Sequence, residues 1–362
     1  MSEAEKEHVQ KLTDQAFALI ELEENEKIIE TCDEILNIEP ENSLILRMRS
    51  IALCNLDKFQ ETLEACDEAL TVEPQNINTM LRRAWALYHL EEYLLTIEEC
   101  DEVLALDPKN MEAFAKKAGA LCHLNLHEEA FKVCETALSI DPKDTAILFL
   151  KAQIFQILKK EREAIEIYEK ILDIDPSDVD ALQAKAWMLE ELNRHQEAIE
   201  TCNEALSLDA ENIPILTIKI FALFELEKYE DAIKTCEDIL TTEPNNIRAL
   251  IVKTKALYRL EKYEEGLQTS KKILPLQQKD IDVLDLHAHL LQQLGKYEES
   301  LQICDEILSF EPNDINTIGT KAWNFGFLGQ RNEAIRCCEE ILKIDPKNID
   351  ALRLRVTIFE NC

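Results

Sequence analysis

A stretch of 34 residues that recurs along the chain decides its fold, and the copy at residues 179–212 reads VDALQAKAWMLEELNRHQEAIETCNEALSLDAEN. Leu192 in this copy belongs to a column of leucines that repeats every 34 residues from Leu22 to Leu328. A second leucine column lies 14 residues further on in each copy and includes Leu206. No insertion or deletion interrupts either column. A fixed period of this size indicates stacked supersecondary units, none of which can bury its apolar face alone.

Each copy carries the pattern of two amphipathic helices. Ten copies fit when they are counted from Val9–Asn42 to Ile315–Asn348, and their apolar residues follow at steps of three and four. Position 34 of every copy is Asn or Asp, whose side-chain oxygen can accept hydrogen bonds from the next helix. The chain has only six glycines and no alternating strand pattern, which predicts an all-α fold. Eight copies have proline at position 32, where it is expected to stop the second helix: Pro40, Pro74, Pro108, Pro142, Pro176, Pro244, Pro312 and Pro346.

On these residues the chain resembles the tetratricopeptide repeat family from about Val9 to its end. The quoted copy matches the family at Leu182, where the family has an apolar residue, and at Leu189, where it has leucine. It also matches at three alanine positions: Ala186, Ala198 and Ala205. The resemblance implies helix pairs stacked into a right-handed α-solenoid, a superhelix whose first helices line a concave groove. In this family the groove is where protein partners usually bind.

The repeat predicts one elongated domain: a lead-in at 1–8, ten repeats at 9–348 and a single terminal helix at 349–362. The first eight residues, MSEAEKEH, are polar and mostly acidic, which argues against a cleavable signal peptide. No apolar stretch approaches the ~20 residues needed to cross a bilayer, so no membrane partner is expected. We expect a cytoplasmic protein.

The net charge of −33 should repel phosphates, so nucleic acid is not an expected partner. Much of the acid is predicted to lie on the outer face of the second helices, as at Glu99, Asp101 and Glu102. Two explanations remain open for this charge. It could keep a long molecule soluble, or it could attract a basic partner.

Twelve cysteines raise the question of redox or metal chemistry. The family usually has a packed aromatic residue at position 24, so cysteine there is expected to be a small buried core residue of a reducing compartment. Cys122, His123 and His127 match no four-ligand zinc pattern, so neither a metal nor a cofactor is expected. Eight cysteines occupy position 24: Cys32, Cys66, Cys100, Cys134, Cys202, Cys236, Cys304 and Cys338.

Position 7 of the first helix is mostly cationic, whereas the family commonly has leucine there. The position borders the buried stripe. Its side chains could pack their stems on apolar neighbours and meet an adjacent carboxylate, or they could form a basic ladder that binds an acidic ligand. The ladder comprises Lys117, Lys151, Lys185, Lys219, Lys253 and Lys321, with Arg49, Arg83 and Arg355 in the same column.

Aromatic residues give the candidate binding site. All three tryptophans lie at position 9, which faces the groove in the family, and further aromatic residues lie at positions 9, 12 and 13. Exposed aromatic residues are enriched at binding hot spots, which favours a partly apolar groove for a peptide or helix. The alternative is that the indoles pack between neighbouring first helices. The candidates are Trp85, Tyr88, Trp187, Phe221, Phe224, Tyr258, Trp323 and Phe327, with Phe17 also at position 9.

The sequence therefore predicts a non-catalytic scaffold or adaptor that binds a protein or peptide partner. No catalytic constellation stands apart from the repeat columns, so an enzyme is not expected. The family's carboxylate clamp for chaperone tails needs Lys at position 5 and Asn at position 9 of one repeat, and no repeat has that pair, so chaperone tails are not expected partners.

The alternative function is a structural subunit of a larger complex or a homodimer. The terminal stretch from Ile349 has no following helix, so Leu352, Val356 and Phe359 would form an uncovered face through which the chain could self-associate. The eighth copy is the most irregular, because Pro275 should end its second helix early and loosen the stack, as a hinge would.

Overall fold

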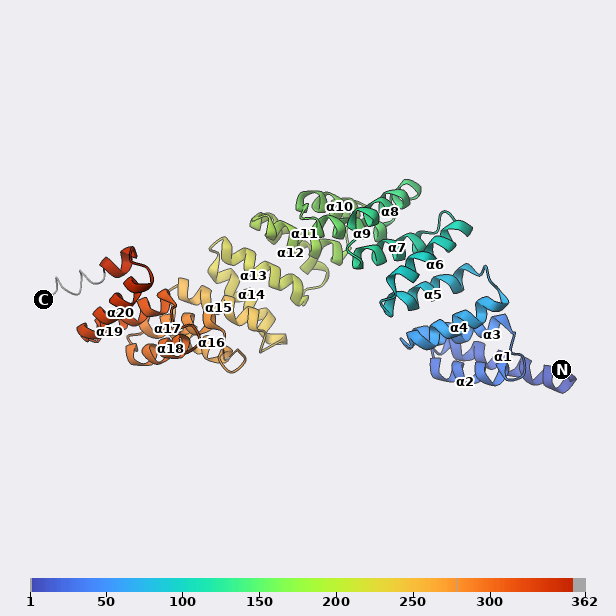
Figure 1. Ribbon diagram of the computed structural model, residues 1–362, viewed down its shortest axis with the longest axis horizontal. Helices are drawn as coiled ribbons and strands as arrows, with labels where there is room; N and C mark the ends of the chain where they lie inside the picture. The colour runs from blue at the N-terminus through green and yellow to red at the C-terminus, as the bar shows by residue number, and fades with distance from the viewer. Residues whose placement is uncertain (1, 278, 354–362) are drawn as a thin grey trace. The chain divides into compact units, whose positions relative to one another are not determined.

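The computed structural model describes residues 2–277 and 279–353. These residues form twenty α-helices that follow one another in pairs, with no strand, and a further helix begins at residue 349 (Figure 1). The prediction of an all-α repeat fold is confirmed. The first helices of the pairs are α1 (Glu3–Glu21), α3 (Ser43–Asn55), α5 (Ile77–His89), α7 (Met111–His123), α9 (Thr145–Ile157), α11 (Val179–Glu191), α13 (Ile213–Glu225), α15 (Ile247–Arg259), α17 (Ile281–Gln293) and α19 (Ile315–Phe327). The second helices are α2 (Asn25–Leu36), α4 (Phe59–Val72), α6 (Tyr93–Leu106), α8 (His127–Ile140), α10 (Glu161–Ile174), α12 (His195–Leu208), α14 (Tyr229–Thr242), α16 (Tyr263–Ile273), α18 (Tyr297–Phe310) and α20 (Arg331–Ile344).

The residue at position 34 caps the first helix of the next copy in every case. Asn42, for example, accepts a hydrogen bond from the amide of Ile45, and Asp144 accepts one from Ile147 at 2.9 Å. The same bond starts the helix at residue 349, where Asn348 accepts from the amide of Ala351 at 3.0 Å. This satisfies one of the amides that a helix start leaves without a partner, so the capping prediction is confirmed.

Proline is not required to end the second helices. α12 ends at Leu208, at the usual position 30, although Ala210 replaces the proline that eight other copies have. Pro275 does shorten its helix as predicted: α16 stops at Ile273 and has 11 residues, against 14 in most other second helices. Whether that junction acts as a hinge stays a prediction.

The turn inside each pair uses a left-handed residue at position 15. Glycine occupies it only at Gly295 and Gly329, both with φ of 71°. Side chains with a Cβ pay a steric cost in this conformation. Eight copies nevertheless have a non-glycine residue there, with φ between 52° and 62°: Glu23, Asp57, Glu91, Asn125, Lys159, Asn193, Glu227 and Glu261.

Two alanine substitutions near this turn are expected to have opposite effects. Gly326 lies inside α19 with open space around its Cβ direction, so Gly326→Ala should raise the free energy of unfolding by about 0.5–1 kcal/mol. Gly329→Ala should lower it by about 1 kcal/mol, because φ is 71° there. The opening free energies of amides in α19 and α20, measured by native-state hydrogen exchange, report both effects; shifts of the same sign would contradict the assignment of the turn.

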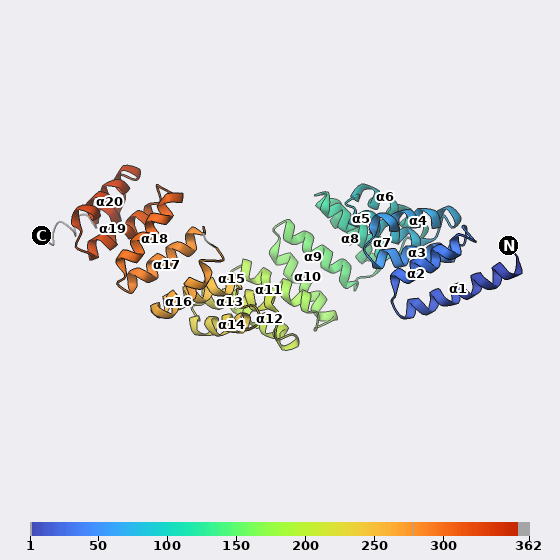
Figure 2. The ribbon, with the colours of Figure 1, turned by 90° about the horizontal axis from the view of Figure 1, so that it is seen from below.

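The helices group into two compact units, residues 1–181 and 182–362, with the boundary inside α11. Each helix packs on the next from α1 to α10 in the first unit and from α12 to α20 in the second. Neighbouring first helices also touch: α3 on α5, α5 on α7 and α7 on α9 in the first unit, and α13 on α15, α15 on α17 and α17 on α19 in the second. Figure 2 shows this succession from below. The division at 1–8, 9–348 and 349–362 stays a prediction. Among the described residues, no helix is both long enough and apolar enough to cross a membrane.

The core of each copy forms where the two helices of a pair meet. All eight cysteines at position 24 are fully buried there, and so are Tyr168 and Ser270 in the two remaining copies. The eleven described cysteines are free thiols. Burial raises the pKa of the Cys100 and Cys236 thiols to about 12. The prediction that the cysteine column is core is confirmed.

Candidate binding groove

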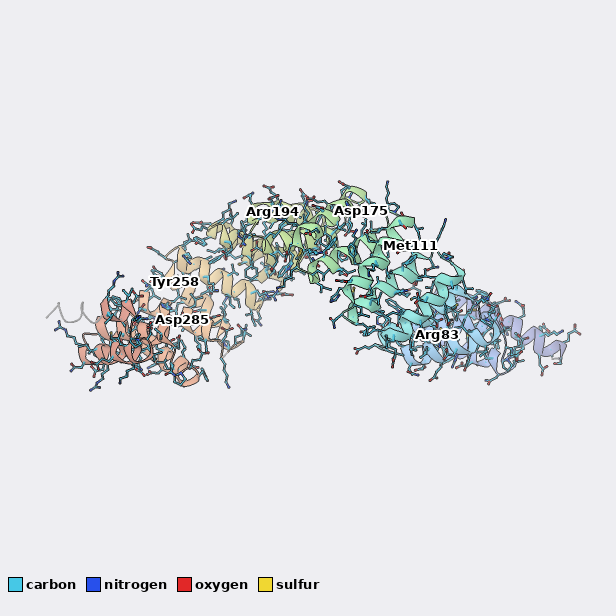
Figure 3. The ribbon with its side chains drawn as sticks, turned by 45° about the horizontal axis from the view of Figure 1, so that its top comes forward. Arg83, Met111, Asp175, Arg194, Tyr258 and Asp285 are labelled. Atoms are coloured by element: carbon cyan, nitrogen blue, oxygen red, sulfur yellow. The ribbon has the colours of Figure 1, made fainter. Side chains whose placement is uncertain are left out.

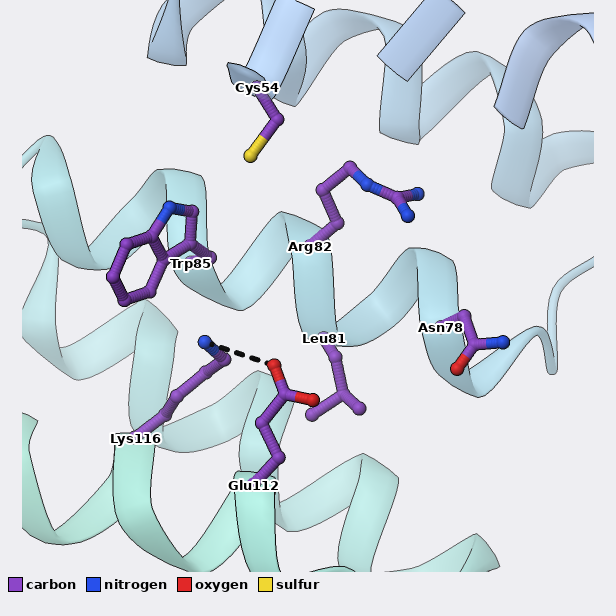
Figure 4. A pocket seen from close by; sticks show the side chains of 7 residues that line it. All are labelled: Cys54, Asn78, Leu81, Arg82, Trp85, Glu112 and Lys116. Atoms are coloured by element: carbon purple, nitrogen blue, oxygen red, sulfur yellow. Dashed lines mark ion pairs between the residues drawn. The ribbon is translucent and has the colours of Figure 1, made fainter. Parts of the chain in front are cut away.

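Neighbouring first helices form three pockets along the face that the family resemblance assigned to the groove. The Trp85 pocket and the Tyr88 pocket lie in the first unit, and the Tyr258 pocket lies in the second. The Trp85 pocket, shown in Figure 4, has a volume of about 440 Å³ and is lined by Cys54, Asn78, Leu81, Arg82, Trp85, Glu112 and Lys116. The Tyr88 pocket, of about 400 Å³, is lined by Tyr88, Gly119, Cys122, His123, Leu150, Gln153, Gln156 and Ile157. The Tyr258 pocket, of about 500 Å³, is lined by Phe224, Lys255, Tyr258, Arg259, Asp282, Asp285, Leu286 and His289.

The three tryptophans are exposed. Trp85 is 38% exposed, Trp187 45% and Trp323 47%, and Phe327 reaches 57%. Tyr88, Phe221, Phe224 and Tyr258 are half-buried, and Phe17 is exposed. These exposures leave apolar ring surface available on the first helices.

In the first unit, Trp85 and Tyr88 belong to a cluster of rings. Their ring planes lie 9° apart on the same face of α5, with centroids separated by 6.4 Å. His89 fills the space between Trp85, at 4.2 Å, and Phe59 of α4, on which it stacks at 4.4 Å. The cluster fixes the orientation of the exposed indole, because its neighbours hold it on two sides.

A second imidazole joins this cluster from α7. The His123 ring stacks on Tyr93 at 4.6 Å, and its Nε2 lies 2.8 Å from the Tyr88 hydroxyl. Gly119 lies under Tyr88, since a Cβ on that glycine would stand 3.4 Å from the tyrosine ring. The absence of a side chain on Gly119 therefore lets the Tyr88 ring pack against α7.

The Trp85 pocket contains two cations and one carboxylate. Lys116 Nζ lies 4.2 Å from the centroid of the Trp85 ring and 3.2 Å from Glu112 Oε1 (Figure 4). Arg82 donates a hydrogen bond to Ser50 Oγ at 3.2 Å. A cation over an indole face is stabilised by the ring's quadrupole, which keeps the ammonium at the pocket wall.

In the second unit the aromatic candidates fall into two groups. Phe224 and Tyr258 line the Tyr258 pocket together with Asp285, which contacts His289 at 3.2 Å; Figure 3 labels Tyr258 and Asp285, on α15 and α17. Trp323 and Phe327 stack on each other one helical turn apart, with centroids 6.0 Å apart. Phe327 also stacks on Tyr297 at 5.0 Å. Phe221 packs against the core of its repeat.

The position 7 cations form ion pairs with position 25 of the preceding copy. Lys253 lies 2.7 Å from Glu237, and Lys321 lies 2.5 Å from Asp305. Each pair joins a first helix to the second helix before it. The same link joins Lys117 to Asp101, Lys151 to Glu135, Arg49 to Asp33 and Arg83 to Asp67.

Two ladder positions differ from this rule or lie outside it. Asn203 replaces the carboxylate that would face Lys219. Lys185, which is half-buried on α11, follows a copy that has Glu169 at position 25. Arg355 lies outside the described residues. Whether the ladder binds an acidic ligand stays a prediction.

One junction reverses the charge pattern of the ladder. Position 7 is His287, and position 25 before it is Lys271. Burial, helped by the nearby Lys271 charge, lowers the pKa of His287 to about 4. Its Nδ1 lies 2.7 Å from the buried Ser270 hydroxyl, so a neutral polar pair replaces the usual ion pair.

Glu99 does not lie on the solvated outer face as the sequence pattern suggested. Its side chain is only 4% exposed and forms an ion pair with Arg83, which also donates from Nε to Asp67 at 2.7 Å. Burial raises the pKa of the Glu99 carboxyl, and the Arg83 charge opposes that rise. Asp101 and Glu102 are exposed, as expected.

Several groove residues were not singled out from the sequence. Arg82 and Lys116 occupy position 6 in successive copies, each directly before a ladder cation. The adjacent basic pairs Arg82–Arg83 and Lys116–Lys117 were the available signal, since only one residue of each pair can point toward the second helix. Among the described residues, no group of three or more metal-ligating side chains is present.

Comparisons with known proteins identify related repeats over the second half of the chain. A family profile described as "Anaphase-promoting complex, cyclosome, subunit 3" matches residues 158–239 and 228–307, and a profile described as "Tetratricopeptide repeat" matches residues 317–348. A search of curated proteins found no match.

Three solved structures illustrate the likeness of fold. A tetratricopeptide repeat protein from Parabacteroides merdae is 12% identical, with a TM-score of 0.49 over 69% of this chain and 99% of that one. YrrB, described as a TPR protein with an unusual peptide-binding site, is 18% identical, with a TM-score of 0.47 over 51% of this chain and 96% of that one. The APC/C hetero-tetramer Cut9–Hcn1 matches at 14% identity, with a TM-score of 0.47 over 95% of this chain and 82% of that one.

The repeat length, the capped helix pairs and the two family profiles agree with one another. The chain belongs to the tetratricopeptide repeat family.

Proposed function

We propose that the chain is a non-catalytic scaffold that binds peptide or helical segments of other proteins along its first helices. Membership of this repeat family indicates a protein–protein interaction scaffold or a subunit of a complex. The observation that carries the finer proposal is the exposure of Trp85, Trp187 and Trp323 on the first helices, with Trp85 at the wall of a pocket. Exposed indoles beside concave surfaces are common anchors of protein interfaces.

Repetition argues against catalysis. A catalytic site needs one asymmetric set of nucleophile, base and orienting group, whereas the polar side chains of this chain mostly recur in columns. The net charge of −33 favours partners whose wider surface is basic. The buried free thiols favour a reducing compartment such as the cytoplasm.

Loss of the three indoles is expected to abolish partner capture. The intact chain and a Trp85→Ala, Trp187→Ala, Trp323→Ala variant are used as baits in native lysate, and the bound proteins are compared by mass spectrometry. Circular dichroism first establishes that the variant is folded. The matched control is Leu94→Ala with Leu95→Ala, which removes exposed apolar residues from the second helix α6.

The expected result is a set of partners that is retained by the control and lost from the tryptophan variant. Hydrogen exchange of the complex should then show protection on first helices. Partners retained equally by all three baits would overturn groove binding and move the interface to another face.

A second candidate is a structural subunit of a larger complex. The profile match to a subunit of the anaphase-promoting complex supports it, and so do Ile349 and Leu352, which are 62% and 43% exposed at the last described turn. Val356 and Phe359, which the sequence analysis placed on the same face, lie outside the described residues. Light scattering tests this candidate. A molecular mass that rises with protein concentration would support self-association through this end, provided that Ile349→Glu abolishes the rise.

A further inference from the structure

The Trp85 pocket is cationic although the chain as a whole is strongly acidic. The chain has 72 Asp and Glu against 39 Lys and Arg, yet this pocket holds Arg82 and Lys116 against Glu112 alone. Among the described residues Arg82 has no ion pair, and its guanidinium donates only to the Ser50 hydroxyl. The pocket therefore has positive charge that the chain itself does not neutralise.

Burial makes this charge effective toward a ligand. The Lys116 side chain is 12% exposed, while its partner Glu112 is 59% exposed and can turn into solvent. A carboxylate that enters the pocket can replace Glu112 at the ammonium and accept from the free donors of Arg82. Such charge-assisted hydrogen bonds are strong at a partly dehydrated site, and guanidinium matches carboxylate in shape. A cationic side chain would instead meet two like charges.

The thiol of Cys54 lies within the electrostatic influence of both cations of the Trp85 pocket. This cysteine lies on α3 at the pocket wall and is half-buried (Figure 4). Burial raises the pKa of this thiol, and the charges of Arg82 and Lys116 oppose that rise. Arg82 from α5 and Lys116 from α7 are therefore both close enough to Cys54 for their charges to act on its thiol.

The Tyr88 pocket next to it has a different character. No Lys, Arg, Asp or Glu is among its lining residues, and Leu150 and Ile157 give it an apolar floor. Gly119 has no side chain at the position where the neighbouring copies have Trp85 and Gln153, and the Tyr88 ring packs over it. The amide of Gln153 can donate to and accept from the backbone of an extended peptide. This pocket suits an apolar side chain.

The two pockets are offset by one repeat along the same groove. The Trp85 pocket is built on α3, α5 and α7, and the Tyr88 pocket on α5, α7 and α9. Packed helices lie ~8–10 Å apart, and an extended chain in the polyproline II conformation advances ~3.1 Å per residue with about three residues per turn, so that every third side chain lies on one face. Side chains that fill both pockets would therefore be about three residues apart.

We propose that the first unit binds an extended partner segment in which an Asp or Glu side chain occupies the Trp85 pocket and an apolar side chain about three residues away occupies the Tyr88 pocket. The proposal rests on the proposed function, because it specifies which segments the groove accepts. The occupant is an internal acidic residue of another protein. A terminal carboxylate and a basic segment are competing occupants that the test separates.

The test uses synthetic peptides blocked at both ends, with Glu-Gly-Ser-Phe at the centre of flexible Gly-Ser flanks. Matched peptides replace Glu by Gln, replace Glu by Lys, or place Glu and Phe next to each other. A fifth peptide carries Gln in place of Glu and a free terminal carboxylate. Binding to the full chain is followed by fluorescence anisotropy at ~0.15 M salt, where the Debye length is about 8 Å and the distant acidic charge is screened.

The Glu peptide is expected to bind about fivefold to tenfold more tightly than the Gln, Lys and adjacent-residue peptides. The Arg82→Gln, Lys116→Gln variant should lose this preference and bind the Glu and Gln peptides equally. The control variant Lys132→Gln, Lys143→Gln removes the same amount of charge from exposed positions of the first unit. This variant should keep the preference for the Glu peptide. Circular dichroism verifies the fold of both variants.

Cys54 provides an independent readout. Bound Glu peptide should slow alkylation of Cys54 by iodoacetamide, as measured by mass spectrometry, while the Gln peptide protects it less. Equal or tighter binding of the Lys, Gln or free-carboxylate peptide would overturn the inference, as would a Glu preference that survives Arg82→Gln, Lys116→Gln. Absence of binding by every peptide would also overturn it.

Failure of this inference differs from failure of the proposed function. If a neutral or basic peptide binds and Trp85→Ala removes that binding, the groove is a binding site but its specificity is not acidic. If lysate partners survive loss of all three indoles, groove binding itself fails whatever the peptides show.

Discussion

Arg83→Met is expected to lower the free energy of local unfolding of α5 and α6 by about 3–5 kcal/mol. The substitution leaves the carboxylate of Glu99 buried without its cation, and an uncompensated buried charge is among the costliest defects in a protein. The opening free energy of amides in α5 and α6 is measured by native-state hydrogen exchange. This local measurement is preferred because long repeat arrays need not unfold as one unit.

The cost of Arg83→Met should depend on pH. Burial holds the pKa of Glu99 above its usual value of 4.5, and loss of the arginine should raise it further. A carboxyl whose pKa is higher in the folded state keeps its protonated, stable form below the unfolded pKa and loses that stability as pH rises through the folded pKa. The variant should therefore be destabilised more at pH 7.5 than at pH 4.5.

A second substitution provides the control. Thr occupies the position of Glu99 in four other copies, at Thr31, Thr201, Thr235 and Thr269. Adding Glu99→Thr to Arg83→Met should recover most of the lost stability and remove its pH dependence. An equal cost at both pH values, or no recovery in the double variant, would refute the assignment of Glu99 as a buried ion-pair partner.

Tyr168→Cys is expected to destabilise α9 and α10 by about 2–4 kcal/mol, although cysteine is the residue that eight copies have at this position. Tyr168 is fully buried and meets Phe149 edge to face at 5.5 Å, so the smaller residue leaves a cavity among side chains already packed around a ring. The loss is measured as the shift in hydrogen-exchange opening energies of these two helices.

Tyr168→Phe is the matched comparison and should cost nothing or stabilise by up to about 1 kcal/mol. Within the described residues, the buried Tyr168 hydroxyl has no hydrogen-bond partner, so its removal relieves a desolvated polar group without opening a cavity. A large loss in the phenylalanine variant would show that the hydroxyl is satisfied, and equal stability in the cysteine variant would show that the ring is not needed for packing.

Local chemistry made much of the fold predictable. Position 34 is Asn or Asp in all ten copies, and a short oxygen-bearing side chain there has one obvious task at a helix start. The turn at position 15 was missed because its left-handed residue is rarely glycine: Glu91 and Lys159 give no sequence sign of the backbone they adopt. Tertiary packing overrides the residue preference at those turns.

The candidate site was predictable only in part. The tryptophan column correctly marked exposed indoles, because the repeat register fixes which face of a helix each position occupies. Glu99 was predicted to lie on the outer face because of its charge. The other copies have Thr, Ala, Val, Ile or Cys at the same position, which would have indicated a buried site. The Trp85 pocket could not be predicted from the sequence of a single helix, because its walls come from three helices in separate copies.

The ladder of ion pairs also bears on how such a chain can change its length. Because position 7 forms an ion pair with position 25 of the preceding copy at most junctions, deleting the block 111–144 would bring Lys151 to Asp101, the same kind of partner that Glu135 provides now. Most copies are interchangeable in this respect, so unequal recombination could add or remove them at little cost. Two junctions differ, because Asn203 replaces the carboxylate before Lys219 and Lys271 replaces it before His287. His287 pairs with Ser270 of the preceding copy, so the two copies that this junction joins are expected to be inherited as one block.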